Sequence, residues 1–178
     1  LTEEAIAHVN HRLALQGLAA TEIRVGDAEC LPYPDNMFDL TYSWGVIHHS
    51  PDTYKSLTEL IRVTKPGGTV KLMVYNRNSL FAFFCYLKHA LLRGKPFRSI
   101  RRVLYYHQES PGTKAFTFRE IKKLLAQLSV TITLLQAPAT HHDLLYYKAK
   151  PFQWFSYALA CVCGWRHVGW FMQIELRK

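Results

Sequence analysis

Apolar residues recur along the chain with two spacings, one typical of helices and one typical of strands. Ile6, Val9 and Leu13 fall on one side of a helix with about 3.6 residues per turn, which predicts a helix near the start of the chain. Thr2 is expected to cap the N-terminus of this helix, and Gly17 is expected to end it.

Short apolar runs bounded by turn residues predict strands. In the first run, Ile23 and Val25 alternate with polar residues, as in a strand with one buried face. The expected strands are 21–25, 38–43, 69–75, 130–135 and 169–176.

A helix is expected between the second and the third of these strands. Ser50 is predicted to be its N-cap and Pro51 its first helical residue. Its buried stripe is expected to consist of Tyr54, Leu57, Leu60 and Ile61. A strand, a helix and a strand joined by short loops are typical of a parallel sheet with right-handed crossovers. The sequence therefore predicts an α/β fold.

Two more helical segments follow the third expected strand. Residues 79–106 are apolar and basic together and are expected to be helical, with a break near Gly94–Pro96. Residues Thr117–Glu120 form a capping box, and Phe116 and Ile121 stand at the positions of a hydrophobic staple.

Composition indicates a globular protein with a basic surface. Aliphatic and aromatic residues make up 49% of the 178 residues, and the net charge is +9. No apolar run approaches the roughly 20 residues that a membrane-spanning helix needs. The four cysteines form no CxxC pair, so we expect free thiols in a reducing compartment and no disulfide framework. The chain contains no acid between Glu59 and Glu109, which leaves open a solvated basic face, an acidic substrate, an anionic membrane or nucleic acid.

Polar residues gather where three of the expected strands end. These ends carry Asp27–Ala28, Ser43–Gly45 and Tyr75–Asn76. In open α/β sheets, ligands bind outside the carboxyl ends of the strands. A carboxylate followed by a backbone N–H suits adenine, which offers an amino donor beside a ring acceptor. We therefore expect an adenine-bearing ligand at this edge.

The string GDAECLPYPDNMFDLTYSWGVIHH, followed by LTELIRVTKPGGTVKLMVY, resembles the central motifs of class I S-adenosylmethionine (SAM)-dependent methyltransferases. The resemblance is closest to the methyltransferase type 11 group, which contains the ubiquinone and menaquinone biosynthesis methyltransferases. It runs from Leu1 to about Asn76, weakens to about Phe116, and returns in the C-terminal part. It implies a Rossmann-like fold with a mostly parallel sheet, an antiparallel C-terminal strand and SAM as cofactor.

The resemblance also implies roles for single residues. Asp27 would hold the adenine amino group and Ala28 its ring nitrogen, while Leu1 would pack on the adenine. The methionine part of SAM would be contacted by Ser43, Trp44 and Gly45. His49 would lie near the transferred methyl group and act as the base if the acceptor must lose a proton, followed in rank by His48 and Tyr75.

The chain departs from the family in its N-terminal part. The glycine-rich loop and the ribose-binding acid of the family have no counterpart here, and neither do the strands that lie between those expected at 21–25 and 38–43. We therefore expect a partial domain, an incomplete fragment that binds SAM poorly by itself. Residues 1–178 are expected to form this single domain, with a substrate lid at 79–106 and a second excursion at 136–167.

Two other kinds of chemistry are disfavoured. His48–His49 and His141–Asp143 contain metal-binding residue types, but neighbours on an extended segment point opposite ways and no i, i+4 pair is present, so no metal is expected. Tyr146 and Lys150 form a YxxxK pair without a supporting serine, which we attribute to chance. The strand end at Ser43 lacks the Asn/Asp-Pro-Pro-Tyr pattern of methyltransferases that act on bases, which disfavours nucleic acid.

The acceptor is expected to be a small or lipophilic molecule, and the protein to be cytoplasmic. Residues 79–106 offer apolar residues (Phe81, Phe83, Phe84, Leu87 and Leu91) beside cations (Lys88, Arg93, Lys95, Arg98, Arg101 and Arg102). Such a segment either closes a core over the sheet or binds peripherally to an anionic membrane. The expected aromatic anchors are Phe152, Trp154, Phe155, Trp165 and Trp170. Two alternatives stay open: a non-catalytic SAM-fold binding module, and another adenine-nucleotide-binding α/β enzyme.

Overall fold

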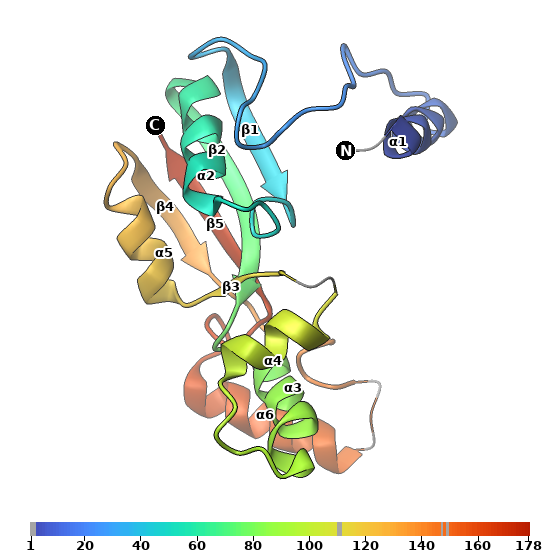
Figure 1. The fold of residues 1–178 in the computed structure, drawn as a ribbon, viewed down its shortest axis with the longest axis vertical. Helices are drawn as coiled ribbons and strands as arrows, with labels where there is room; N and C mark the ends of the chain where they lie inside the picture. The colour runs from blue at the N-terminus through green and yellow to red at the C-terminus, as the bar shows by residue number, and fades with distance from the viewer. Residues whose placement is uncertain (1–2, 110–111, 147, 149) are drawn as a thin grey trace.

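The computed structural model describes residues 3–109, 112–146, 148 and 150–178. Its centre is a sheet in which β1 and β2 run parallel and β5 runs antiparallel between β2 and β4 (Figure 1). The strands in spatial order are β1 (Phe38–Trp44), β2 (Thr64–Asn76), β5 (Phe171–Arg177) and β4 (Thr131–Gln136), and the short β3 (Ala115–Phe116) pairs with the end of β2. The predicted α/β fold with an antiparallel C-terminal strand is confirmed.

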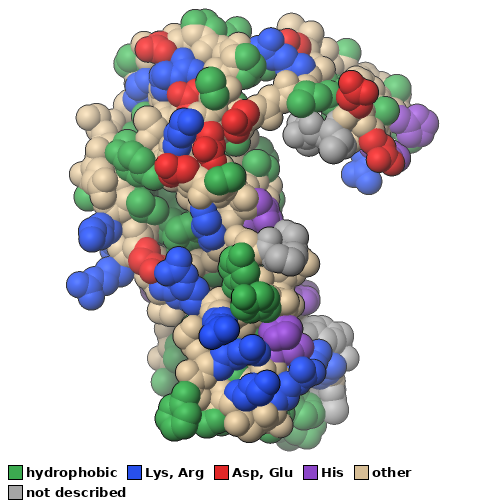
Figure 2. All heavy atoms as spheres, in the orientation of Figure 1, with side chains coloured by type: hydrophobic (Ala, Val, Ile, Leu, Met, Phe, Trp, Pro, Cys, Tyr) green, Lys and Arg blue, Asp and Glu red, His purple; other side chains and the backbone are tan. Residues whose placement is uncertain are grey.

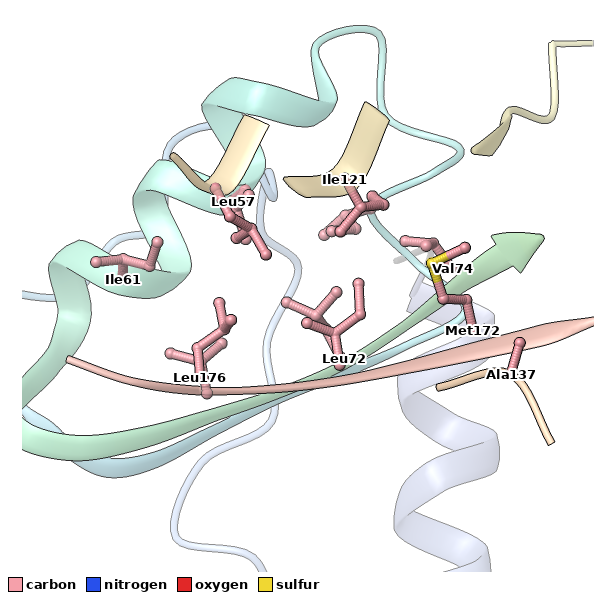
Figure 3. Packing of buried hydrophobic residues seen from close by; sticks show 12 residues of the cluster. Leu57, Ile61, Leu72, Val74, Ile121, Ala137, Met172 and Leu176 are labelled. Atoms are coloured by element: carbon pink, nitrogen blue, oxygen red, sulfur yellow. The ribbon is translucent and has the colours of Figure 1, made fainter. Parts of the chain in front are cut away.

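Two helices cover one face of the sheet and enclose the main core. They are α2 (Thr53–Val63) and α5 (Phe118–Leu125). Leu57 of α2 and Ile121 of α5 point toward Leu72 and Met172 of the strands (Figure 3). The predicted apolar side of α2 is confirmed at Leu57 and Ile61, which are both buried. The parallel β1–α2–β2 unit is thus held by an ordinary hydrophobic core.

The start of α2 lies two residues later than predicted. Asp52 is the N-cap, and its carboxylate accepts a hydrogen bond from the backbone N–H of Lys55. Ser50 is not the cap, because its hydroxyl donates to the Glu29 carboxylate at 2.6 Å and accepts from the Ser56 hydroxyl at 2.7 Å, and not from a backbone N–H of the first turn. The expectation for Ser50 and Pro51 is therefore wrong.

A helical lobe extends from the end of the sheet (Figure 1). It consists of α3 (Leu80–His89), the 3-10 turn η1 (Leu91–Arg93), α4 (Ile100–His107) and α6 (Lys150–Cys163). The predicted break is confirmed, since η1 ends at Gly94 in a left-handed conformation with φ of 68°. No helix in the described part of the chain is long and apolar enough to cross a membrane.

One expected aromatic anchor belongs to the core and not to the surface. Trp170 is only 3% exposed and stacks on Tyr75, with ring centroids 4.4 Å apart. Its backbone N–H donates to the buried carboxylate of Asp143, at 2.8 Å. The expectation that Trp170 anchors the protein to a membrane is therefore wrong.

The N-terminal segment lies apart from the sheet. Helix α1 (Glu3–Leu15) forms as predicted but buries none of its residues, and Figure 1 shows it beside the body of the molecule. Residues 21–25 belong to no helix or strand and pair with no strand among the described residues, so the strand predicted there is not formed. A strand requires hydrogen-bonding neighbours, and alternation of side chains alone does not supply them.

Candidate functional site

The carboxyl ends of β1 and β2 lie side by side, as expected for a parallel pair. Trp44 is in register with Met73, and the backbone N–H of Gly45 donates to the Met73 carbonyl at 3.4 Å. Gly45 has φ of 75°, a conformation that suits glycine and lets the chain leave the sheet directly after β1. The residues that follow, 47–49, form a turn at this edge of the sheet.

The turn brings the rings of His48 and His49 together, with ring centroids 4.3 Å apart. His48 is fully buried, and neither of its ring nitrogens has a hydrogen-bond partner among the described residues. Burial lowers the pKa of His48 to about 4, the neighbouring His49 adds to this effect, and the backbone of Met73 opposes it. The His49 side chain, in contrast, is 34% exposed. The two histidines are therefore neighbours in sequence with very different surroundings.

A carboxylate that the sequence did not point to, Glu109, completes this cluster. Its Oε2 lies 3.4 Å from Nε2 of His49, and its Oε1 accepts a hydrogen bond of 2.5 Å from the Tyr75 hydroxyl. The Tyr75 ring also packs on His48, with ring centroids 4.1 Å apart. Burial, together with the hydrogen bond to Glu109, raises the pKa of Tyr75. All three expected catalytic residues are thus brought together, with Glu109 joining two of them.

Residues after Glu109 hold the loop that follows β1. Thr113 Oγ1 lies 3.3 Å from Nδ1 of His49. The Lys114 ammonium donates to the carbonyls of Ser50 and Pro51, at 2.8 and 2.6 Å. Thr113 and Lys114 also line a cavity of about 480 Å³ between α4 and α5. The histidine turn and the residues after it are therefore held by Thr113 and Lys114, which also belong to the wall of this cavity.

Glu29, two residues after Asp27, connects the segment of Asp27 to the same loop. The Asp27 side chain is exposed, and its Oδ1 accepts from the backbone N–H of Glu29 at 2.9 Å. Glu29 Oε1 accepts from the Ser50 hydroxyl and from the backbone N–H of Asp52, at 2.6 and 2.7 Å. These two hydrogen bonds lower the pKa of Glu29, that from Asp52 most strongly. They hold the segment that carries Asp27 and Ala28 against the connection between β1 and α2, while Leu1 lies outside the described residues.

Side chains at the two strand ends differ in what they can offer a ligand. Ser43 is buried and is in register with Leu72 on the face that α2 covers. Trp44 is exposed on the opposite face and stacks on Tyr42. The Asn76 amide donates to the carbonyls of His167 and Gly169, at 2.8 and 3.0 Å, and is fully buried. Trp44 and the backbone are thus available at this edge, whereas Asn76 has a structural role.

The helical lobe contains an apolar cavity of about 500 Å³. Its walls include Phe81, Phe84, Cys85 and Phe152, and the polar residues around it include the stacked pair His89 and His107, with ring centroids 4.3 Å apart. Burial raises the pKa of the Cys85 thiol to about 11, which keeps it uncharged. The cavity has a size and a lining typical of sites for small apolar ligands.

Comparisons with known proteins identify relatives of the N-terminal part. A family model described as a methyltransferase domain matches residues 1–72. Demethylmenaquinone methyltransferase from Desulfitobacterium hafniense is 52% identical over 50 residues, which cover 28% of this chain and 19% of that protein. Ajmaline N-methyltransferase from Rauvolfia serpentina is 38% identical over 72 residues, which cover 36% of this chain and 25% of that enzyme. The chain thus matches only a minor part of the length of these curated relatives.

Solved structures match almost the whole chain. A SAM-dependent methyltransferase from Methanosarcina mazei has a TM-score of 0.63 at 18% sequence identity. The match covers 99% of this chain and 78% of that protein. The cyclase SpnF has a TM-score of 0.60 at 15% sequence identity, and the match covers 99% of this chain and 63% of the cyclase. These likenesses confirm the Rossmann-like fold of SAM-dependent methyltransferases, and the family model confirms the resemblance of residues 1–72.

Proposed function

Because the chain carries part of the methyltransferase domain of the class I SAM-dependent methyltransferases, we propose that the whole protein transfers the methyl group of SAM to a small or lipophilic acceptor. The observation that carries this proposal is that Trp44 and the histidine turn lie at the carboxyl edge of β1 and β2, where Glu29, two residues after Asp27, accepts from Ser50. In open α/β sheets this edge is where ligands bind.

The polar groups of these segments suit the adenosine and methionine parts of SAM. Asp27 is exposed, and its carboxylate, held at Oδ1 by Glu29, can accept from the adenine amino group. The N–H of Ala28 would donate to the ring nitrogen, and the backbone at Ser43–Gly45 would contact the methionine part. SAM supplies an activated methyl group, so the protein mainly needs to align the acceptor and exclude water.

His49 is the best placed of the three expected catalytic residues to accept a proton from the acceptor. It is the exposed member of the histidine pair, whereas His48 is fully buried. Tyr75 has a raised pKa and donates a hydrogen bond to Glu109, so it stays protonated at neutral pH and cannot take the proton of an acceptor. This argument favours His49 for acceptors that must be deprotonated, such as phenols and enols.

The helical lobe supports a lipophilic acceptor that is reached at a membrane surface. Leu92 is 81% exposed, and the Phe97 side chain is fully exposed. Figure 2 shows Lys and Arg side chains gathered over the same lobe, together with apolar ones. Phe152, Trp154 and Phe155 are exposed on α6. Apolar tips among cations suit the boundary of an anionic membrane, and the nearby cavity of about 500 Å³ suits a lipophilic group.

One structural relative leaves open a reaction other than methyl transfer. The cyclase SpnF shares this fold over 99% of the chain, so the fold alone does not determine the reaction. A non-catalytic binding module would also retain the fold.

Labelled SAM separates these functions. The natural full-length protein would be incubated with SAM that carries a radioactive methyl group, together with a total lipid and quinone extract. Methyl transfer predicts label in the organic phase, lost when His49 is changed to Ala. Binding of SAM without any labelled product over a broad acceptor panel would contradict methyl transfer and favour the binding module.

A further inference from the structure

The turn after β1 presents three potential metal ligands to one another. One nitrogen each of His48 and His49 and one carboxylate oxygen of Glu109 all lie within 4.8 Å of one another. The expectation of no metal assumed that His48 and His49 lie on an extended segment and point apart. That assumption is wrong, because residues 47–49 form a turn and the two rings lie close together.

The contacts around the cluster leave two potential ligand atoms facing each other. Tyr75 donates to Oε1 of Glu109, and Thr113 lies at Nδ1 of His49. This leaves Oε2 of Glu109 and Nε2 of His49 facing each other at 3.4 Å. In a tetrahedral zinc site with bonds of about 2.0–2.1 Å, two ligand atoms lie roughly 3.3–3.4 Å apart. The observed distance therefore matches one edge of such a site.

His48 supplies an independent observation. It is fully buried, and neither ring nitrogen has a hydrogen-bond partner among the described residues. Buried polar atoms are normally satisfied, and the Met73 backbone can serve one ring nitrogen at most, so at least one nitrogen requires an explanation. A metal ion bound to one of them would provide it.

We propose that His48, His49 and Glu109 bind a divalent ion of the zinc type. Two imidazoles and a carboxylate are a donor set that zinc uses in catalytic sites with a fourth, open position. Tyr75 and Thr113 fill the supporting role that hydrogen-bonded neighbours of metal ligands have. With the ion bound, His49 is a ligand and no longer a proton acceptor. An acceptor oxygen at the open position would then lose its proton to solvent more easily, a consequence that rests on the proposed function.

The test uses metal alone, so it depends on neither SAM nor an acceptor. The natural full-length protein is freed of metal with a chelator and titrated with Co²⁺, followed by visible absorption, and with Zn²⁺, followed by calorimetry. The expected result is one saturable site per chain with the intense visible bands of four-coordinate cobalt. His49→Ala and Glu109→Gln, both at exposed positions, should each abolish these bands. Thr113→Val should weaken metal binding by about 10- to 100-fold.

The matched control is His141→Ala combined with His142→Ala, a second adjacent pair of exposed histidines that lies outside the cluster. This variant should bind Co²⁺ like the wild type. The proposal is overturned if no saturable site is found, or if binding survives in His49→Ala and Glu109→Gln. Either result would leave His49 as the proton acceptor, and the proposal of methyl transfer would be unaffected.

Discussion

Arg62 shows how a single side chain holds the segment before β1 onto helix α2. Its guanidinium donates to the carboxylates of Glu59 and Asp35, each at 2.7 Å, and to the carbonyls of Tyr33 and Leu31. Four acceptor residues, from helix α2 and from the segment 31–35, require the planar fork of arginine, which lysine cannot reproduce.

Arg62→Lys should therefore lower the free energy of unfolding by about 1.5–3 kcal/mol, the range for hydrogen bonds to charged groups. Urea denaturation measures this value. The control is Lys65→Met, which removes an exposed ion pair with Asp39 and should leave the midpoint unchanged. Equal effects of the two substitutions would show that Arg62 acts as an ordinary surface charge.

The same contact makes stability depend on pH through Glu59. The hydrogen bond from Arg62 lowers the pKa of Glu59, and the N–H of Leu31 adds to the shift, while partial burial opposes it. A carboxyl whose pKa is lower in the folded state than its ordinary 4.5 stabilises the fold above that value. This contribution is lost as pH falls from about 4.5 through the folded pKa.

Unfolding of the wild type and Glu59→Gln should therefore be compared by urea at neutral pH and in acid below 4.5. The wild type should be more stable at neutral pH, and the difference between the two proteins should shrink in acid. A difference that stays constant with pH would contradict this role of Glu59.

The sequence predicted some of these residues and missed others for a physical reason. The pattern at the strand ends pointed to Tyr75, and the resemblance to the family pointed to His49 with His48 beside it, because each signal lies in a local stretch of sequence. Glu109 and Arg62 act through partners 34 and 27–31 positions away in the chain, and no local pattern records such partners.

At the scale of elements, the start of α5 was predicted because all of its determinants are local. The Thr117 hydroxyl accepts from the N–H of Glu120 at 3.2 Å, and the Glu120 carboxylate accepts from the N–H of Thr117 at 2.8 Å. The start of α2 was misplaced because the Ser50 hydroxyl bonds to Glu29, far away in the sequence, and to Ser56, while Asp52 caps the helix. The strand expected at 21–25 was wrong because a strand depends on neighbours that its own sequence does not encode.

Thr117→Ala should lower the free energy of unfolding by about 1 kcal/mol, because the first turn of α5 would lose its cap. Thr117→Ser, which keeps the hydroxyl, is the matched control and should stay close to the wild type. Thermal unfolding by circular dichroism distinguishes the two. An alanine variant as stable as the serine variant would show that the cap contributes nothing here.

At the scale of the whole molecule, the sheet and the helical lobe have different surfaces. The lobe carries exposed apolar side chains at Leu92 and Phe97 together with the cations Arg98, Arg101 and Arg102. The resemblance to the family predicted a lid here, but only the structure shows which residues are exposed, because burial depends on the packing of α3, α4 and α6.

The natural full-length protein should sediment with vesicles, more strongly as the anionic lipid content rises and less strongly with added salt. Changing Arg98, Arg101 and Arg102 together to Ser should weaken this binding, at about 1 kcal/mol for each cation near the surface. The control changes Lys122 and Lys123 to Ser, on α5 outside the lobe, and should bind as the wild type does. Equal, negligible sedimentation with neutral and anionic vesicles would exclude the membrane and leave a soluble acceptor.

The most direct test of the account is calorimetric titration of SAM into the natural full-length protein and two variants. Asp27→Ala should weaken SAM binding by about 1.5–3 kcal/mol, or roughly 10- to 150-fold, because the adenine amino group loses a charged acceptor. Asp39→Ala removes another exposed carboxylate, the partner of Lys65, and should leave the affinity unchanged. Unchanged affinity in a folded Asp27→Ala protein would contradict the placement of SAM at the carboxyl ends of β1 and β2.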